Sequence, residues 1–383
     1  MVVNEGDGGG LARIEVNVGA LVPNGSVGER PEESPRVPGP VLSVVLPVYD
    51  SAATVETTLR ALRASRFRDF ELIVVDDGSR DESAAIVERW KPDQLARNER
   101  NQGHLAARNR GASLARGRVL FFTDADVRVR EDTLGRVAAW FEDPAVDCVV
   151  GLYEPLEPHE NLASAYKNAW IHHSYARSPE RIDWFFTAVG AVRREVFERE
   201  GGFRSDFRRE SGGGDVEFGR RLHDAGVSIH LDKCLCVTHH RRFTVGSLLR
   251  NDYRRAAGWT RLALARPGGA RAVAARGVAN VSRGFAASSA LALAAWLALP
   301  LAGVAGLLAP ALAFVAQVVV DRSFLSFSWR IFGPRRCAAF ALLGVLDRLA
   351  CGAGMAAGVF ATLFARPPVL GANAPVPSSA DDR

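Results

Sequence analysis

Apolar and polar residues alternate in blocks along the first half of the chain. Val41–Val48, Phe70–Val75 and Val119–Thr123 are continuous apolar runs rich in β-branched or aromatic residues, which is typical of strands buried on both faces. Segments with helical spacing separate these runs: Thr54–Ser65, Glu82–Trp90 and Leu105–Ala115. Repeated β-α-β units of this length predict an α/β fold with a parallel sheet and helices on both faces.

Each predicted strand is followed by polar residues. Tyr49 follows the first strand, Asp76 and Asp77 follow the second, and Asp124 and Asp126 follow the third. Ligands of such sheets bind beyond the carboxyl ends of the strands. Two acids separated by one residue lie on the same side of an extended segment and repel each other when both are ionised. The pattern therefore predicts a divalent cation, Mg²⁺ or Mn²⁺, which takes the rest of its shell from substrate phosphates and water.

Two common phosphate-binding signatures are absent from the sequence. No G-x-x-x-x-G-K-[ST] loop occurs, which argues against P-loop ATP chemistry. The first strand is not followed by G-x-G-x-x-G, which argues against a dinucleotide-dependent redox enzyme.

A long uncharged block begins at Gly284 and ends at Val320. A single helix of this length would measure about 55 Å, whereas a bilayer core is about 30 Å thick. Pro300 and Pro310 offer places to turn. We expect two short membrane spans, at about 285–301 and 304–320, joined in a hairpin; one tilted span followed by an interfacial segment is the alternative.

A second apolar block, Cys337–Phe364, is interrupted only by Asp347 and Arg348. We expect these adjacent opposite charges to pair with each other inside a helix bundle. The segment between the two blocks is rich in arginine: Arg322, Arg330, Arg335 and Arg336. The positive-inside rule makes this segment a cytoplasmic loop, and places the N-terminal domain on the same side of the membrane.

Residues 245–283 are basic and amphipathic. They contain eight arginines and one acid, Asp252, interleaved with apolar and aromatic residues. We expect interfacial helices on an anionic leaflet, with Tyr253 and Trp259 at headgroup depth. A solvated helix face is the alternative.

Composition supports a chain of mixed character. Its 383 residues are 48% hydrophobic and 24% charged, so a soluble domain joined to membrane helices fits. The net charge is +5, but lysine supplies only Lys91, Lys167 and Lys233, which is typical of a GC-rich genome. The basic charge is therefore weak support for a nucleic-acid partner, and we expect none. Five scattered cysteines favour reduced thiols over a disulfide framework or a structural zinc site.

The motifs, taken together and in order, resemble family 2 glycosyltransferases of the GT-A fold. The resemblance covers about residues 41–260 and rests on the following segments: VVLPVYD at 44–50, ELIVVDDGSRD at 71–81, NQGHLAARNRGASLARG at 101–117, FFTDAD at 121–126, VGAVRREVFEREGGF at 189–203, GGGDVEFGRRLHDAG at 212–226, and the pair His239-His240.

The resemblance implies a UDP-, GDP- or dTDP-sugar donor, a divalent metal (Mn²⁺ or Mg²⁺) and an inverting transfer to an acceptor hydroxyl. It implies that Pro47 and Tyr49 line the base pocket and that Asp77 hydrogen-bonds the base. It places Asp124 near the ribose or metal and Asp126 on the metal that bridges the diphosphate. Arg108, on the helix beside the donor cleft, is a candidate phosphate contact; a solvent-exposed position is the alternative.

Asp215 matches the family's general base, which deprotonates the acceptor hydroxyl. The sequence departs from the family pattern immediately before it, where Gly214 replaces the usual Glu. We expect the run Gly212–Gly214 to make this loop mobile. Glu217 is a second candidate for the base, and capping of the following helix is the structural alternative for Asp215.

The histidine pair and several aromatic residues complete the candidate site. The resemblance implies that His239 or His240 touches the diphosphate or metal, and we assign this role to His240. His172 and His173 lie in a segment expected on the acceptor side. For the aromatic residues of that region we favour core packing over stacking on a sugar: Trp170, Tyr175 and Trp184.

These inferences define the following organisation: a flexible tail at 1–40, a GT-A catalytic domain with a mostly parallel central sheet at 41–244, basic interfacial helices at 245–283, transmembrane helices at 284–364 and a flexible tail at 365–383. We expect a hexosyltransferase anchored in the bacterial inner membrane, with a cytoplasmic catalytic domain and a lipid-linked or cell-envelope glycan acceptor. A processive polysaccharide synthase is one alternative, although residues 254–259 resemble its Q-x-x-R-W motif only loosely and lack the Gln. A non-catalytic membrane scaffold that retains the fold is the other.

Overall fold

The computed structural model describes residues 39–156, 161–204, 213–264, 282–298 and 308–364. The two predicted tails lie almost wholly outside these residues. So do residues 265–281 of the predicted interfacial helices and the turn of the predicted hairpin.

The strands and helices follow one another as the apolar pattern predicts, with additions. The strands are β1 (Leu42–Val48), β2 (Phe70–Asp76), β3 (Gln94–Arg97), β4 (Val119–Thr123), β5 (Val127–Arg128), β6 (Cys148–Tyr153), β7 (Arg181–Ile182), β8 (Val189–Arg193) and β9 (Ile229–His239). The helices are α1 (Val55–Arg63), α2 (Ser83–Trp90), α3 (His104–Ser113), α4 (Thr133–Trp140), α5 (Leu162–Ala176), α6 (Arg194–Arg199), α7 (Gly213–Asp224), α8 (Val245–Leu264), α10 (Arg283–Ala298), α11 (Leu308–Val320) and α12 (Arg322–Phe364).

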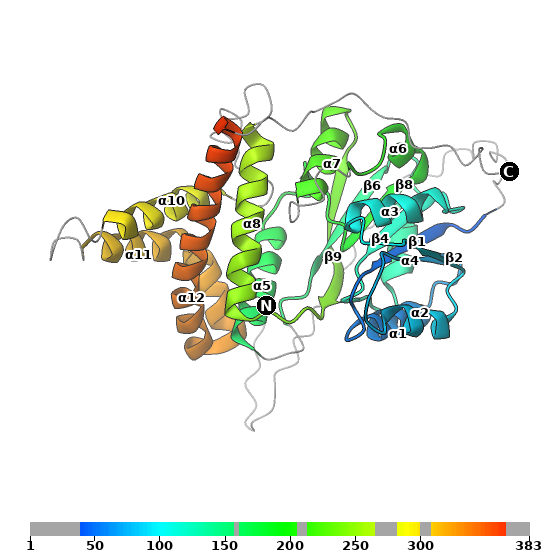
Figure 1. Cartoon of the computed structure of the whole chain (residues 1–383), viewed down its shortest axis with the longest axis horizontal. Helices are drawn as coiled ribbons and strands as arrows, with labels where there is room; N and C mark the ends of the chain where they lie inside the picture. The colour runs from blue at the N-terminus through cyan, green and yellow to red at the C-terminus, as the bar shows by residue number, and fades with distance from the viewer. Residues whose placement is uncertain (1–38, 157–160, 205–212, 265–281, 299–307, 365–383) are drawn as a thin grey trace, which may run out of the picture. The chain divides into compact units, whose positions relative to one another are not determined.

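The strands form one mixed sheet in the order β3-β2-β1-β4-β8-β6-β9-β5, with β7 also paired to β9. The N-terminal half, β3 to β4, is parallel. β8 is antiparallel to both β4 and β6, and β6 is parallel to β9. The three predicted strands are β1, β2 and β4, and they lie side by side at the centre of the parallel half (Figure 1). The apolar pattern did not reveal the short polar edge strand β3.

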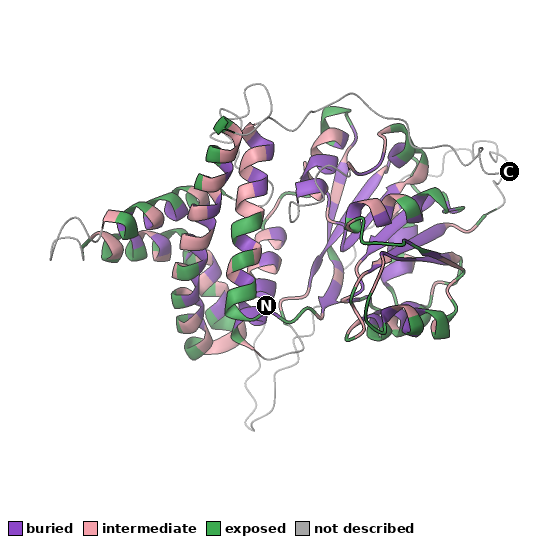
Figure 2. Ribbon diagram, viewed as in Figure 1, coloured by how far each residue is buried: buried purple, intermediate pink, exposed green. Residues whose placement is uncertain are grey.

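Burial explains why these runs are strands. β4 is buried along its whole length and β1 at every position except one, because helices cover both faces of the sheet (Figure 2). Helix α3 packs on β1 and β2, where Gly111 faces Val45 and Val75 so closely that a methyl group would collide with Val45. Parallel register brings the end of β1 beside the end of β2, with Val48 opposite Asp76. The polar residues that follow the strands therefore gather at one edge.

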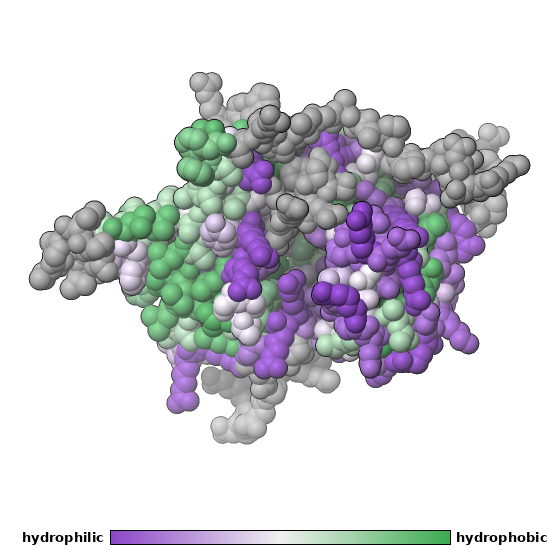
Figure 3. All heavy atoms as spheres, in the orientation of Figure 1, coloured by the Kyte–Doolittle hydropathy of each residue, from purple (hydrophilic) through white to green (hydrophobic). Residues whose placement is uncertain are grey.

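The C-terminal helices carry a large apolar surface. Exposed apolar side chains are concentrated on α10, α11 and α12, with Leu312, Leu363 and Phe364 each more than two-thirds exposed. Figure 3 shows this green surface beside the more hydrophilic surface of the α/β region. Within the described residues, only α12 is long and apolar enough to cross a membrane; α10 and α11 are apolar but shorter. Helices α10 and α11 pack against each other, as the predicted hairpin requires.

The predicted arginine-rich loop between the apolar blocks is instead helical. Helix α12 starts at Arg322 and is broken at Gly333, whose φ of 78° is left-handed. Pro334 follows, and proline at the first position of a helix has no amide hydrogen to leave unpaired. The segment is thus two helices meeting at a Gly-Pro kink.

Helix α8 lies along the second part of α12 (Figure 1). Glycines make this approach close: a Cβ on Gly354 would stand 2.3 Å from the Tyr253 carbonyl oxygen, and one on Gly358 would stand 2.6 Å from that of Ala257. Small residues four positions apart allow two helix backbones to touch. One side of this part of α12 is therefore covered by α8, a helix that carries arginines.

Buried polar contacts connect the C-terminal helices to the catalytic region. Tyr166 of α5 donates a hydrogen bond of 2.9 Å to Asp347 of α12. Lys167, the next residue, forms a buried ion pair with Asp252 of α8. Arg348 pairs with Asp321 and also donates to Ser288. The predicted mutual pairing of Asp347 with Arg348 is therefore wrong, because adjacent helical residues point about 100° apart and each finds a partner on another helix.

Candidate active site

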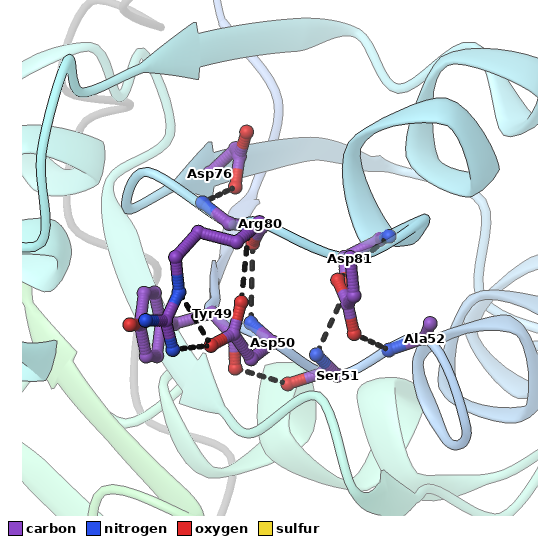
Figure 4. Close-up of polar contacts among 9 residues, drawn as sticks. Tyr49, Asp50, Ser51, Ala52, Asp76, Arg80 and Asp81 are labelled. Atoms are coloured by element: carbon purple, nitrogen blue, oxygen red, sulfur yellow. Dashed lines mark hydrogen bonds and ion pairs between the residues drawn. The ribbon is translucent and has the colours of Figure 1, made fainter.

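The turn after β1 is held by a network of polar contacts (Figure 4). Asp50 has a φ of 44°, and its carboxylate accepts hydrogen bonds from the Arg80 backbone N–H at 2.8 Å and from the Arg80 guanidinium at 2.6 Å. The guanidinium also lies over the Tyr49 ring, 5.6 Å from its centre. Asp81 secures the same turn by accepting from the Ala52 N–H at 3.0 Å. These contacts fix Tyr49 at the edge of the cleft described next.

Asp77, at the end of β2, is buried and accepts three hydrogen bonds. They come from the Asn98 side chain at 2.6 Å and from the backbone N–H groups of Gln102 and Gly103 at 2.9 and 2.8 Å. The carboxylate therefore holds the loop that precedes α3. Each carboxylate oxygen has two lone pairs, so Asp77 retains capacity for a ligand.

A cleft of about 450 Å³ lies beyond the ends of β1, β2 and β4. It brings together all but one of the predicted site residues: Pro47, Tyr49, Asp77, Arg108, Asp124, Asp126 and Asp215. The residue that does not line it is His240. The cleft also contains residues that were not predicted: Asn101, His104, Thr187 and Arg241.

Asp124 and Asp126 have different partners despite their proximity in sequence. Asp124 forms an ion pair with Arg108, whose side chain is almost completely buried. The predicted phosphate contact is thus already engaged with a carboxylate. Burial raises the pKa of Asp124 in spite of Arg108. Burial would also raise the pKa of Asp126, but the His239 ring and Arg241 outweigh it and lower that pKa.

The ring beside Asp126 belongs to His239. Its Nε2 lies 3.7 Å from Asp126 Oδ2, whereas His240 contributes its backbone N–H to the Asp126 carbonyl at 2.7 Å. The His239 Nδ1 is 3.0 Å from Asn168 Oδ1, and the Asn168 amide nitrogen faces the His239 carbonyl oxygen. This arrangement makes Nδ1 the donor to Asn168. The other ring nitrogen, Nε2, faces Asp126.

These donors suit a divalent cation. Asp126 Oδ2 and His239 Nε2 lie 3.7 Å apart, and carboxylate oxygen and imidazole nitrogen are both ligands of divalent cations, so one cation could bind both. Among the described residues no cluster of three His, Cys, Asp or Glu side chains is preassembled for a metal. Mg²⁺ or Mn²⁺ needs no such cluster, because substrate phosphates and water fill most of its shell.

Asp215 lies in the first turn of α7 rather than at its cap. Its Oδ2 accepts a hydrogen bond of 2.9 Å from the Thr187 hydroxyl, whereas its Oδ1 is buried with no hydrogen-bond partner among the described residues. Gly214 is explained by packing: a Cβ at this position would lie 2.3 Å from a methyl group of Leu105 in α3. A larger side chain at this position would require the buried Leu105 side chain to move.

A second cavity of about 150 Å³ adjoins the cleft. The two share Asp124, Asp126, Asp215 and Arg241, so the three carboxylates stand where they meet. Its far wall is formed by α5 and α8, with Lys167, Asn251 and Arg255. Tyr175 and Trp184 line it but are buried against each other, with ring centres 4.2 Å apart, as the prediction of core packing requires.

Arg241 and Thr187 line the cleft but were not predicted from the sequence, and they differ in the sequence signal that could have identified them. Arg241 directly follows the histidine pair, so its position in a polar motif was a usable signal. Thr187 precedes β8 in an apolar stretch, and only the packing of β8 against α7 reveals that it supports Asp215.

Comparisons with known proteins agree with this geometry. Residues 43–201 match the family model described as Glycosyl transferase family 2. Glycosyltransferase AglE of Haloferax volcanii is 28% identical over 221 residues, which are 56% of this chain and 71% of that protein. Validoxylamine A glucosyltransferase of Streptomyces hygroscopicus subsp. jinggangensis is 29% identical over 229 residues, and the match spans 51% of this chain and about half, 54%, of that enzyme.

The fold is also that of a solved enzyme. The structure of mannosyltransferase PcManGT from Pyrobaculum calidifontis in complex with GDP-Man and Mn²⁺ has a TM-score of 0.53 and 20% sequence identity, over 85% of this chain and 88% of that one. The matching family region contains the strand ends that carry Asp77, Asp124 and Asp126. Residues 43–201 therefore form a domain of glycosyl transferase family 2.

Proposed function

We propose that the protein is a membrane-anchored, metal-dependent inverting glycosyltransferase with Asp215 as general base. The observation that carries this proposal is the position of Asp124, Asp126 and Asp215 where the larger cleft meets the smaller cavity. A donor in the cleft and an acceptor in the cavity would meet at these carboxylates. The nucleotide-sugar donor is supported by PcManGT, whose fold is similar and whose solved complex contains GDP-Man and Mn²⁺.

In the proposed reaction the acceptor hydroxyl attacks the anomeric carbon of the donor sugar. Asp215 takes the hydroxyl proton through Oδ1, because Thr187 already occupies Oδ2. The bond from the anomeric carbon to the diphosphate oxygen breaks, and its electron pair leaves on the nucleoside diphosphate. Attack from the opposite face inverts the anomeric configuration.

The remaining cleft residues hold the donor. Tyr49 and Asp77 line the same cleft and would contact the base, while Asp126 and His239 would hold the cation. A bound Mn²⁺ or Mg²⁺ would stabilise the charge that develops on the leaving diphosphate. We assign the histidine role to His239 rather than His240, since the His239 ring stands beside Asp126.

Membrane anchoring is proposed from the exposed apolar side chains of α10, α11 and α12. Exposed Arg330 and Arg335 lie with Trp329 near the kink of α12, and exposed Arg322 begins that helix; this combination suits an interface. The acceptor cavity borders α8, which packs on α12. A lipid-linked acceptor at the membrane surface would reach the carboxylates from this side.

The test is metal-dependent release of nucleoside diphosphate by the full chain in detergent, from a panel of UDP-, GDP- and dTDP-sugars. We expect one donor to react with Mn²⁺ or Mg²⁺, and Asp126→Asn and Asp215→Asn to lose at least about a hundredfold in rate. Glu142→Gln, an exposed carboxylate away from the cleft, is the matched control and should keep full activity. Absence of nucleotide binding with every donor would instead support a non-catalytic scaffold.

A further inference from the structure

Helix α12 touches the catalytic region or α8 along most of its length. The Tyr166 ring of α5 meets those of Phe324 and Phe340, with ring centres 5.9 and 5.7 Å away. The Tyr166 hydroxyl donates to Asp347. Further along, a Cβ on Gly358 would stand 2.6 Å from a backbone oxygen of α8. A membrane span needs about 20 consecutive residues, and no stretch of that length in α12 is free of such contacts.

The two helices that make these contacts do not suit the interior of a bilayer. Helix α5 lies between β6 and β7 in the chain and is held to the sheet, since the His172 Nδ1 is 2.8 Å from the Tyr153 carbonyl oxygen of β6. If α12 crossed the membrane, it would draw the edge of the sheet and the charges of α8 into hydrocarbon, where both are costly. Helix α8 carries four arginines: Arg250, Arg254, Arg255 and Arg261.

Helices α10 and α11 are placed differently. They lie almost wholly in the block Gly284–Val320, which has no charged residue. One end of the pair is fixed: Phe285 packs on α5, and Gln317 donates a hydrogen bond of 3.1 Å to a backbone carbonyl of α12. Toward the other end, Leu297 and Leu308 are each 65% exposed. Figure 1 shows α10 and α11 extending to the left of α8 and α12.

The second part of α12 has one polar and one apolar side. Asp347 and Arg348 are buried and form polar contacts with other parts of the chain. A helix with two such sides is suited to lie in the membrane interface, with its apolar side toward the acyl chains. The exposed side chains of this part are large and apolar: Leu342, Leu346, Phe360 and Leu363.

We propose that α10 and α11 penetrate the lipid, whereas α12 lies beside α8 along the membrane surface and does not cross it. The chain then enters and leaves the bilayer on one side, and its C-terminus is on the same side as the catalytic region. A third span, which the apolar block Cys337–Phe364 predicts from the sequence alone, would place the C-terminus on the opposite side. The inference rests on the membrane anchoring of the proposed function and adds its geometry.

Labelling of cysteines with a maleimide that cannot cross lipid tests this proposal in sealed vesicles of phosphatidylcholine and phosphatidylglycerol. Exposed Cys234 of β9 reports the side of the catalytic region, in a chain with Cys236→Ser. The vesicles are those in which nearly all of Cys234 reacts from outside. A cysteine appended after Arg383, in a chain with Cys234→Ser and Cys236→Ser, should then react to the same fraction of the total measured in SDS. An appended cysteine that reacts only after the vesicles are dissolved would overturn the proposal.

A second pair of variants, in the same background, identifies the part that enters the lipid. Leu312→Cys of α11 should be protected in vesicles, whereas Leu114→Cys, its matched control on the catalytic region, should react. Reaction of both to the same extent would overturn the insertion of α11. Oxidation of Leu312→Cys to a disulfide-linked dimer, with a yield that does not fall on dilution with lipid, would show that a second copy of the chain covers this surface instead.

Release of nucleoside diphosphate, measured on the same vesicles, separates this inference from the proposed function. If no donor reacts but the appended cysteine and Cys234 are labelled alike, the transferase function fails and the geometry stands. If a donor reacts and the appended cysteine is protected, only the geometry fails. A chain that does not float with the vesicles would overturn both the anchoring and its geometry.

Discussion

Single residues in this protein are placed by neighbours far away in the sequence. Asp215 is oriented by Thr187, on a segment that leads into the central sheet, and Asp126 is approached by His239 at the end of β9. Their chemical types were visible in the sequence, but their partners depend on the pairing of β8 and β9 with the strands around them. At this scale the structure adds which oxygen of each carboxylate already faces a protein partner.

The Thr187 hydroxyl should control the activity of Asp215. Thr187→Val removes the hydrogen bond to Oδ2 and leaves the carboxylate free to rotate, so we expect kcat to fall about ten- to a hundredfold with little change in the donor KM. Thr187→Ser keeps the hydroxyl and should retain most of the activity. Steady-state kinetics with the preferred donor provides the measurement, and equal kinetics for the valine and serine variants would contradict a positioning role.

We expect a side chain at position 214 to lower the stability of the protein unless Leu105 is shortened. The Cβ of Gly214→Ala would collide with a Leu105 methyl group, so we expect a loss of about 1–3 kcal/mol in the free energy of unfolding. Leu105→Ala creates the missing space, and the double variant should be more stable than the sum of the single effects predicts. Urea unfolding of the four proteins completes this cycle. Simple additivity would show that the contact is not limiting.

At the scale of elements, helix α4 is fastened to β9 through Asp232. Its carboxylate accepts hydrogen bonds from Arg136 Nη2 at 2.8 Å, Trp140 Nε1 at 2.8 Å and the Cys234 N–H at 2.9 Å. Burial would raise the pKa of Asp232, but these donors outweigh it, and the net pKa is lowered. A carboxylate of this kind stabilises the fold at pH values above its pKa in the unfolded chain. This stabilisation is lost as the pH falls through the lower pKa that the carboxylate has in the folded protein.

We therefore expect Asp232→Asn to be less stable than the wild type at pH 7, by about 1–2 kcal/mol. The difference should begin to shrink below about pH 4, the ordinary pKa of an aspartate, because the unfolded wild type then takes up a proton, and it should disappear only below the lowered pKa of the folded protein. Urea unfolding of both proteins from pH 7 to about pH 2.5 measures it, with Glu142→Gln as the surface control. A difference that stays constant with pH would mean that packing, and not ionisation, causes the loss.

The contact between α8 and α12 depends on glycine. Gly354→Val would force its side chain into the Tyr253 carbonyl, so we expect the two helices to separate and the Tm to fall by several degrees. Ala356→Val, at an exposed position of the same helix, should leave Tm nearly unchanged. Thermal unfolding in detergent compares the two. A similar fall in both would point to helix propensity rather than to interhelical packing.

Local elements were the part of the fold that the sequence predicted best. β1, β2 and β4 are apolar runs buried on both faces, and α1 and α2 are amphipathic helices that bury one face, so the sequence pattern predicts these elements directly. β3 was missed because it is a short polar edge strand. The sequence predicts a loop for the arginine-rich segment before Pro334, because its charged residues interrupt the apolar pattern of a helix that is half apolar.

For the whole molecule, the sequence predicted the family and most of the cleft, because both depend on motifs at strand ends. It did not predict how the C-terminal helices meet the catalytic region. Asp347 and Arg348 illustrate the reason: their partners, Tyr166 on α5 and Asp321 between α11 and α12, cannot be identified from spacing. The side of the membrane on which the catalytic region lies remains a prediction from the arginine distribution.

The apolar surface of α10, α11 and α12 leads to a prediction about the intact protein. Exposed Leu312, Leu363 and Phe364 would be unfavourable in water. Another side of α12 packs against α8, a helix that carries arginines. We therefore expect insertion into lipid from one side, with the full chain staying in the membrane fraction after washing with 1 M salt and with carbonate at pH 11. Release by salt alone would contradict this, because attraction between arginines and anionic lipids is screened at that ionic strength whereas burial of apolar side chains is not.

Replacing Leu312 and Val315 together by Gln should increase the fraction that carbonate releases. Replacing Leu114, an exposed apolar residue of the catalytic region, by Gln should not.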